Sequence, residues 1–167
     1  MNKKLMVAVL ALSLGASFVG CASGEPAPEG GVTSPEAAVT LTSEEVYAKI
    51  TEGMEMPSLQ APPAEIFSDV YGMDTTLLTD YIVMQPMMSG VITEIGVFQV
   101  ADPANVGAVV EKANARLDAL KNGGAFYPSH VEIVEKGQVV SNGNYVLFVA
   151  DEKVDTIVAN FNALFAN

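Results

Sequence analysis

The stretch at residues 138–150 limits the fold more than any other part of this sequence. Asn142-Gly143 is a strong signal for a two-residue hairpin loop, because both central positions of that turn take a positive φ. Val139-Val140 precede the turn, and residues 145–149 follow it as a run that is apolar on both faces. A strand of that kind lies in the interior of a sheet. We therefore predict a β-hairpin whose second strand is central.

A second pair of strands is indicated at residues 81–84 and 94–100. Both segments are rich in β-branched and aromatic residues, which fit a pleated surface. Pro86 marks the end of the first strand or an edge position. Because the connection between the two segments is wide, we predict an antiparallel hairpin with a long loop.

The clearest helix begins at Asp102-Pro103, where Asp102 fits the cap and Pro103 the first helical position. Apolar residues then recur at helical spacing and predict one buried stripe: Val106, Val109, Val110, Ala113, Leu117 and Leu120. Polar residues, Arg116 among them, are expected on the other side. Asn122-Gly123-Gly124 ends the helix.

Shorter helices are expected around these elements. Thr42 and Glu45 have the spacing of a capping box and predict an N-terminal helix. Asp151 is expected to cap the last helix. Residues 128–135 fit either a short helix or the start of a strand, and we favour the helix. Three prolines make residues 54–63 irregular.

The order helix, hairpin, helix, hairpin, helix predicts an α+β fold. We expect a four-stranded, mainly antiparallel sheet built from the two hairpins, with amphipathic helices packed on one face. The N-terminal helix would lie at an edge or across an end. Residues 41–167 would form this single domain, which is long enough for a substantial core.

The N-terminus predicts where the protein lies. Lys3 and Lys4 form a basic head, residues 5–19 are mostly apolar, and Gly20-Cys21 closes the run. Such a run is too short to span a bilayer, which takes about 20 residues. A basic head with a short apolar core indicates a secretory signal at residues 1–20.

Cys21, the only cysteine in the chain, stands directly after that signal. The arrangement resembles the lipobox of bacterial lipoproteins, in which the cysteine receives a diacylglycerol and becomes the new N-terminus. Phe18 stands where a lipobox usually has Leu. The resemblance implies a protein held on the extracytoplasmic face of the cell membrane by a lipid on Cys21.

Composition supports a tethered, acidic domain. Residues 21–40 are rich in Ala, Gly, Pro, Ser and Glu, so we expect a disordered tether. The signal holds two lysines and no acid, so the rest of the chain has 20 acidic and 6 basic residues and a net charge of −14. Such a charge disfavours a nucleic-acid partner. A single cysteine excludes an internal disulfide.

Several short motifs follow one another in an ordered spacing. They are Tyr71-Gly72-Met73-Asp74, Asp80-Tyr81, Gln85-Pro86-Met87, Glu94-Ile95-Gly96-Val97-Phe98, Arg116-Leu117-Asp118-Ala119-Leu120-Lys121 and Gly143-Asn144-Tyr145-Val146-Leu147-Phe148-Val149. Together with the signal and the tether, they resemble the small lipoproteins of Gram-positive bacteria grouped as domain of unknown function 4358. The resemblance covers about residues 41–165. It implies a fold and a location, and it implies no activity, substrate or catalytic residue.

The sequence offers no evident catalytic set. His130 is the only histidine, and its neighbours Ser129 and Glu132 are too close in sequence to form a typical triad with it. Because Cys21 is assigned to the lipid, thiol catalysis and cysteine-based zinc sites are excluded. One histidine leaves no standard zinc set. We assign no catalytic residue, no metal and no cofactor.

Four acids that are close in sequence supply the alternative function. Asp69, Asp74, Asp80 and Glu94 could perform glycosidase-type hydrolysis or bind Ca²⁺, provided that they converge in a pocket. Asp74 also fits a helix cap, and Asp80 a strand start. The alternative is thus a cell-envelope hydrolase or metal-binding protein that uses clustered carboxylates.

Methionine is concentrated in one region, with six residues within 35 positions: Met54, Met56, Met73, Met84, Met87 and Met88. Thioethers pack in cores, form adaptable surfaces for partners, or bind Cu(I). We predict a binding face made by Tyr81, Met84, Met87 and Met88. The favoured function is a membrane-anchored, non-enzymatic domain that binds a protein partner or a small ligand.

Overall fold

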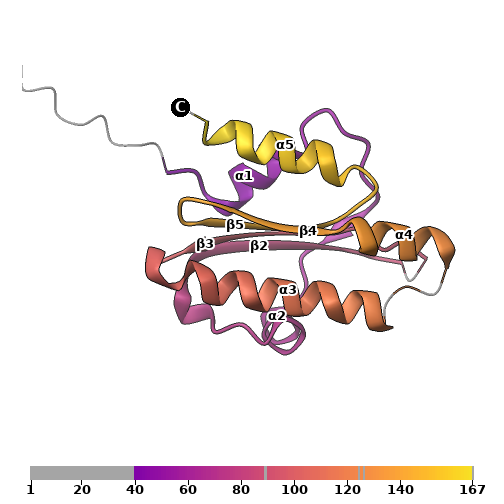
Figure 1. Ribbon diagram of the computed structural model, residues 1–167, viewed down its shortest axis with the longest axis horizontal. Helices are drawn as coiled ribbons and strands as arrows, with labels where there is room; N and C mark the ends of the chain where they lie inside the picture. The colour runs from indigo at the N-terminus through magenta and orange to yellow at the C-terminus, as the bar shows by residue number, and fades with distance from the viewer. Residues whose placement is uncertain (1–39, 89, 124, 126, 167) are drawn as a thin grey trace, which may run out of the picture. The chain divides into compact units, whose positions relative to one another are not determined.

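The computed structural model describes residues 40–166, apart from residues 89, 124 and 126. They form an α+β domain with helices on both sides of an open antiparallel sheet (Figure 1). The predicted signal, Cys21 and the tether up to residue 39 lie outside the described residues. Among the helices that the structure describes, none is long and apolar enough to cross a bilayer.

Twelve elements follow one another along the described chain. They are α1 (Ser43–Ile50), β1 (Leu59–Gln60), α2 (Ala64–Tyr71), the 3₁₀-helix η1 (Thr75–Leu77), β2 (Leu78–Pro86), β3 (Glu94–Val100), the 3₁₀-helix η2 (Pro103–Asn105), α3 (Val106–Gly123), α4 (Pro128–Lys136), β4 (Gln138–Asn142), β5 (Tyr145–Ala150) and α5 (Val154–Leu164).

The sheet has five strands in the order β1-β2-β3-β5-β4, so the prediction of four strands was wrong. The added strand is β1, in which Leu59 pairs with Pro86 and Gln60 with Gln85. It lies between Pro57 and Pro62, within the segment expected to be irregular. Because prolines limit pairing there to two residues, no alternating pattern marks the strand in the sequence.

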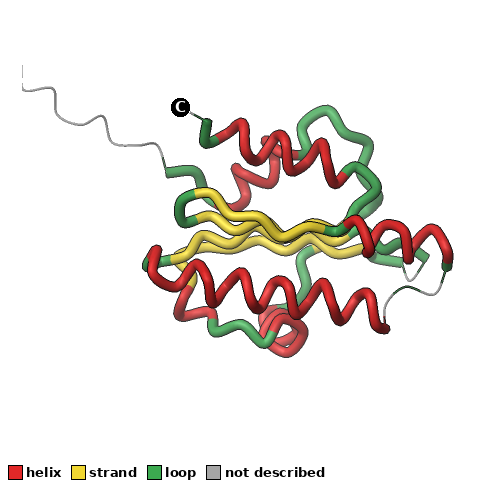
Figure 2. The backbone as a smooth tube through the Cα atoms, in the orientation of Figure 1, coloured by secondary structure: helices red, strands yellow, loops and turns green. Residues whose placement is uncertain are grey.

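Helices cover both faces of the sheet, which corrects the expected one-sided packing. Figure 2 shows the strands edge-on, with α1 and α5 on one side and α2 and α3 on the other. Each face has its own apolar core, one with α1 and α5 and the other with α2 and α3. All seven residues of β3 and all six of β5 are buried.

Side-chain alternation explains the two cores. Ile95 and Val97 of β3 point toward α1 and α5, whereas Phe98 and Val100 point toward α2 and α3. Strands that are apolar on both faces need a cover on both faces. The same run at residues 145–149 that predicted a central strand therefore also implied a second layer of helices.

The second hairpin forms one residue later than the turn signal suggested. Asn142 pairs with Tyr145, so Gly143 and Asn144 make the two-residue loop, not Asn142 and Gly143. Gly143 takes φ 57°, and Asn144 Nδ2 donates a hydrogen bond to the Val100 carbonyl at 3.1 Å. That bond holds the loop against the end of β3.

Local signals at several helix starts are confirmed. Thr42 and Glu45 form the capping box of α1. Asp102 accepts a hydrogen bond from the Ala104 N–H, although the first turn is 3₁₀ and α3 begins only at Val106. The short helix favoured at residues 128–135 is α4.

Candidate functional site

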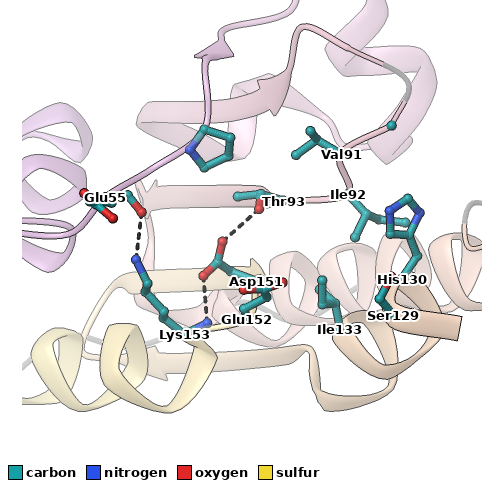
Figure 3. Close-up of a pocket in the computed structure, with 12 residues that line it drawn as sticks. Glu55, Val91, Ile92, Thr93, Ser129, His130, Ile133, Asp151, Glu152 and Lys153 are labelled. Atoms are coloured by element: carbon teal, nitrogen blue, oxygen red, sulfur yellow. Dashed lines mark hydrogen bonds between the residues drawn. The ribbon is translucent and has the colours of Figure 1, made fainter. Parts of the chain in front are cut away.

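One pocket of about 400 Å³, called the end pocket below, lies where four distant segments meet (Figure 3). Its lining comes from the loop after α1 (Glu55, Pro57), the connection into β3 (residues 90–93), α4 (Ser129, His130, Ile133) and the loop between β5 and α5 (Asp151, Glu152, Lys153). Its volume falls within the range of small-molecule sites, about 300–1,000 Å³.

Two hydrogen bonds hold the side chain of Asp151 in place in the end pocket. Its side chain is buried, its Oδ2 accepts the Thr93 hydroxyl at 2.8 Å, and its Oδ1 accepts the Lys153 N–H at 2.8 Å (Figure 3). Thr93 is buried too. The carboxylate thus ties the entry of β3 to the exit of β5, because both oxygens are engaged. It caps the turn before α5, not α5 itself, which begins at Val154.

The end pocket has a positively charged and a negatively charged side chain beside Asp151, those of Lys153 and Glu152. Lys153 Nζ donates to the Glu55 carbonyl at 2.7 Å, which holds the loop after α1 against the start of α5. Glu152 lines the pocket from the same loop, and Val91, Ile92 and Ile133 supply apolar walls (Figure 3). Such a lining can hold a small ligand that has both polar and apolar parts.

The end pocket continues along α4. A hollow of about 250 Å³ shares Ser129, Ile133 and Glu152 with it and is otherwise lined by Glu132 and Lys136. Lys136 Nζ lies 2.7 Å from Glu132 Oε1, and this partner lowers the pKa of Glu132. Both side chains are exposed, so the pair adds little to stability but places a charge of each sign at the rim.

A second polar cluster is buried beneath the opposite face of the sheet. Glu94, at the start of β3, accepts three hydrogen bonds: from Tyr71 Oη at 2.5 Å, from Arg116 Nε at 2.9 Å and from Arg116 Nη2 at 2.6 Å. The Glu94 side chain is 4% exposed and that of Arg116 is 18% exposed. This cluster joins α2, β3 and α3.

Burial and the two charges change the proton affinity of the cluster. Burial raises the pKa of Tyr71 well above its ordinary value, and the negative charge of Glu94 adds to the rise. Burial lowers the pKa of Arg116, but the hydrogen bonds to Glu94, the negative charge of Glu94 and the contact with Tyr71 together outweigh that effect, and the pKa is raised. Glu94 and Arg116 together are electrically neutral, as a buried pair should be.

A hollow of about 230 Å³, called the Arg116 pocket below, opens beside this cluster. Glu94, Arg116 and the Gln85 amide are its polar groups. The remaining walls are apolar: Pro86, Val91, Ile92 and Leu120. Val91 and Ile92 also line the end pocket, so the two pockets lie on either side of one short segment.

The structure does not gather the predicted binding residues into one face. Tyr81 stacks on Phe67 of α2, with ring centroids 4.3 Å apart. Met84 lies on the opposite side of β2, on the same face as Ile82, because side chains alternate along a strand. Met87 and Met88 are 60% and 67% exposed after the end of β2. Ligand binding by these residues stays a prediction.

The four acids of the alternative function are also separated. Asp74 accepts the Thr76 N–H and caps η1, Asp80 accepts the Ser43 N–H at the start of α1, and Glu94 lies in the buried cluster. Asp69 is exposed on α2. In the part of the chain that the structure describes, no group of three or more His, Cys, Asp or Glu side chains could hold a metal ion.

Sequence reasoning did not find the role of Arg116 or the pocket position of His130. Arg116 lies three residues after Ala113 and four before Leu120, so it flanks the buried stripe of α3 and reaches beneath the sheet. It is also the only arginine in the chain. His130 meets Tyr127 edge-on with centroids 5.1 Å apart, and among the described residues it has no hydrogen bond to Ser129 or to a carboxylate.

Comparisons with known proteins identify a family for most of the domain. A family model described as Domain of unknown function (DUF4358) matches residues 43–151. That range includes α1 to β5, Thr93 and Asp151 of the end pocket, and Glu94 and Arg116 of the Arg116 pocket. Searches of curated proteins and of solved structures found no significant match.

Proposed function

Since this chain belongs to a family described only as a domain of unknown function, DUF4358, we propose a function from its site and its N-terminus. The protein is an extracytoplasmic lipoprotein, and its domain binds a small ligand of mixed polarity in the end pocket without changing it chemically. The basic head, the short apolar run and Cys21 support the anchored location.

The end pocket is the observation that carries the binding function. It is large enough for a small molecule, and its base is held by the buried Thr93–Asp151 hydrogen bond. A pocket with a fixed base needs little reordering when a ligand enters, which favours affinity. Asp151 has both oxygens engaged and His130 is not bonded to Ser129, so the geometry favours binding over acid–base catalysis.

Thermal unfolding of the full chain in mild detergent tests this proposal. We would screen amino acids, short peptides, monosaccharides and glycan fragments. A ligand at 100 times its Kd stabilises the folded state by about 2.7 kcal/mol and so raises the melting temperature by several degrees. Ser129→Trp should fill the pocket and abolish this rise.

Val131→Trp is the matched control, because Val131 is exposed on α4 and does not line the pocket. It should respond to the ligand like the wild type. The proposal fails if no compound raises the melting temperature, or if Ser129→Trp responds as strongly as Val131→Trp.

A further inference from the structure

Two exposed methionines, Met87 and Met88, lie in the connection between β2 and β3, and residues at both ends of that connection line the Arg116 pocket. Pro86 and Val91 are walls of the pocket, and Met87 and Met88 lie between them in the sequence. Large apolar side chains that stay exposed beside a hollow mark an interaction surface. The flexible thioether side chains of Met suit such a surface because they adapt to the shape of a partner.

The size of the Arg116 pocket suggests what fills it. Its volume of about 230 Å³ lies below the range of about 300–1,000 Å³ that is usual for small-molecule sites. Protein interfaces, in contrast, often depend on one anchor side chain that enters a small pocket. A single large side chain therefore fits this hollow better than a whole metabolite does.

The lining indicates an uncharged, apolar anchor. Pro86, Val91, Ile92 and Leu120 form apolar walls, and Glu94 and Arg116 already neutralise each other. An added full charge would have to lose its hydration beside a pair that offers no net opposite charge. An aliphatic or methionine side chain avoids that penalty.

Arg116 and Gln85 can form hydrogen bonds with the partner's backbone next to the anchor side chain. A guanidinium has five N–H donors, and Glu94 accepts from two of them. The partly exposed Arg116 side chain thus has donors left for a backbone carbonyl. The Gln85 amide, which also lines the pocket, both donates and accepts.

The net charge of the chain indicates which residues should flank the anchor side chain in the partner protein. A net charge of −14 after the signal repels an acidic partner and attracts a basic one. We propose that the Arg116 pocket and the Met87-Met88 pair dock a partner protein that presents one large aliphatic side chain flanked by basic residues. The site goes beyond the small-ligand function of the end pocket and does not depend on it.

NMR titration of the full chain in detergent micelles tests the proposal with acetyl-Lys-Leu-Lys-amide as the probe. Saturable shifts are expected at the methyl groups of Leu120 and at the Arg116 Nε–H, which line the Arg116 pocket and not the end pocket. Acetyl-Lys-Gly-Lys-amide, which lacks the anchor, should bind about tenfold more weakly or worse, because burial of a Leu side chain is lost. Acetyl-Glu-Leu-Glu-amide should bind several-fold more weakly, and salt should reduce that difference.

A surface variant separates the docking site from the fold. Met87→Ser/Met88→Ser changes only exposed side chains and should weaken the Leu probe several-fold, whereas Val131→Ser on α4 should leave it unchanged. The proposal is overturned if the Leu and Gly probes bind equally, if no shift saturates, or if the shifts centre on Thr93 and Asp151 of the end pocket.

Discussion

Glu94 is a carboxylate that the fold buries almost completely, with three hydrogen-bond donors around it. A buried charge is tolerated only when it is paired and hydrogen-bonded. Substitution of Tyr71 or Arg116 therefore destabilises the fold when the new side chain cannot donate the same hydrogen bonds to Glu94. Arg116 can offer two parallel N–H groups, which Lys cannot, so an Arg→Lys change at this position is not conservative.

Tyr71→Phe removes one donor and keeps the ring. At pH 8 we expect the free energy of unfolding to fall by about 1.5–3 kcal/mol, the usual effect of losing a hydrogen bond to a charged group. The exposed Tyr127→Phe should change it by less than about 0.5 kcal/mol. Urea denaturation at constant ionic strength measures both.

The same variant makes a prediction about pH. The pKa of Tyr71 is raised in the folded state above its ordinary 10.0. The stabilisation is therefore complete below pH 10, and it declines as the pH rises above 10, because the unfolded chain then loses the proton first. The gap between wild type and Tyr71→Phe should narrow from pH 10 upward. A gap that stays constant or widens from pH 8 to pH 11 would contradict the burial of Tyr71.

At the scale of single elements, the second hairpin depends on one backbone conformation. Gly143 has φ 57° in the loop between β4 and β5, where an L side chain is strained. Gly143→Ala should lower the free energy of unfolding by about 1 kcal/mol, measured as a lower urea midpoint at unchanged slope.

Gly107→Ala is the matched control in α3. An added Cβ at Gly107 meets open space and no positive φ is required there, so Ala should raise stability by up to about 1 kcal/mol. If both variants shift the urea midpoint in the same direction, the left-handed conformation of Gly143 is not the reason that Ala at this position changes the stability.

Elements with local signals were predictable from the sequence. The capping box of Thr42, the Asp102-Pro103 start and the apolar run in β5 each act over a few residues. β1 could not be predicted, because two residues show no alternation and their pairing with Gln85 and Pro86 depends on distant parts of the chain. The apolar run of β5 has two buried faces, so it also implied helices on both sides of the sheet. The one-sided packing expected from the sequence left one of those faces uncovered.

The site was less predictable than the fold. The end pocket is built from segments almost 100 residues apart, such as Glu55 and Lys153, which no motif connects. The Met-rich stretch predicted a surface, and Met87 and Met88 are exposed, but strand alternation separates Tyr81 from Met84. Arg116 had a readable signal as the only arginine beside the buried stripe of α3.

For the whole molecule, the proposed function depends on location. A binding domain on the outer face of the membrane would meet ligands and partners that never enter the cytoplasm. Without the proposed signal the chain has a net charge of −14, which would keep its body from adsorbing to anionic lipid. The lipid on Cys21 would supply the attachment that the domain itself disfavours.

Intact-mass analysis of the full chain purified from the membranes of producing cells tests this location most directly. The polypeptide should begin at Cys21 and carry the added mass of a diacylglycerol, and Cys21→Ala should release the domain from the membrane fraction. An unmodified chain that still begins at Met1 and is recovered from the cell interior would contradict the proposed location.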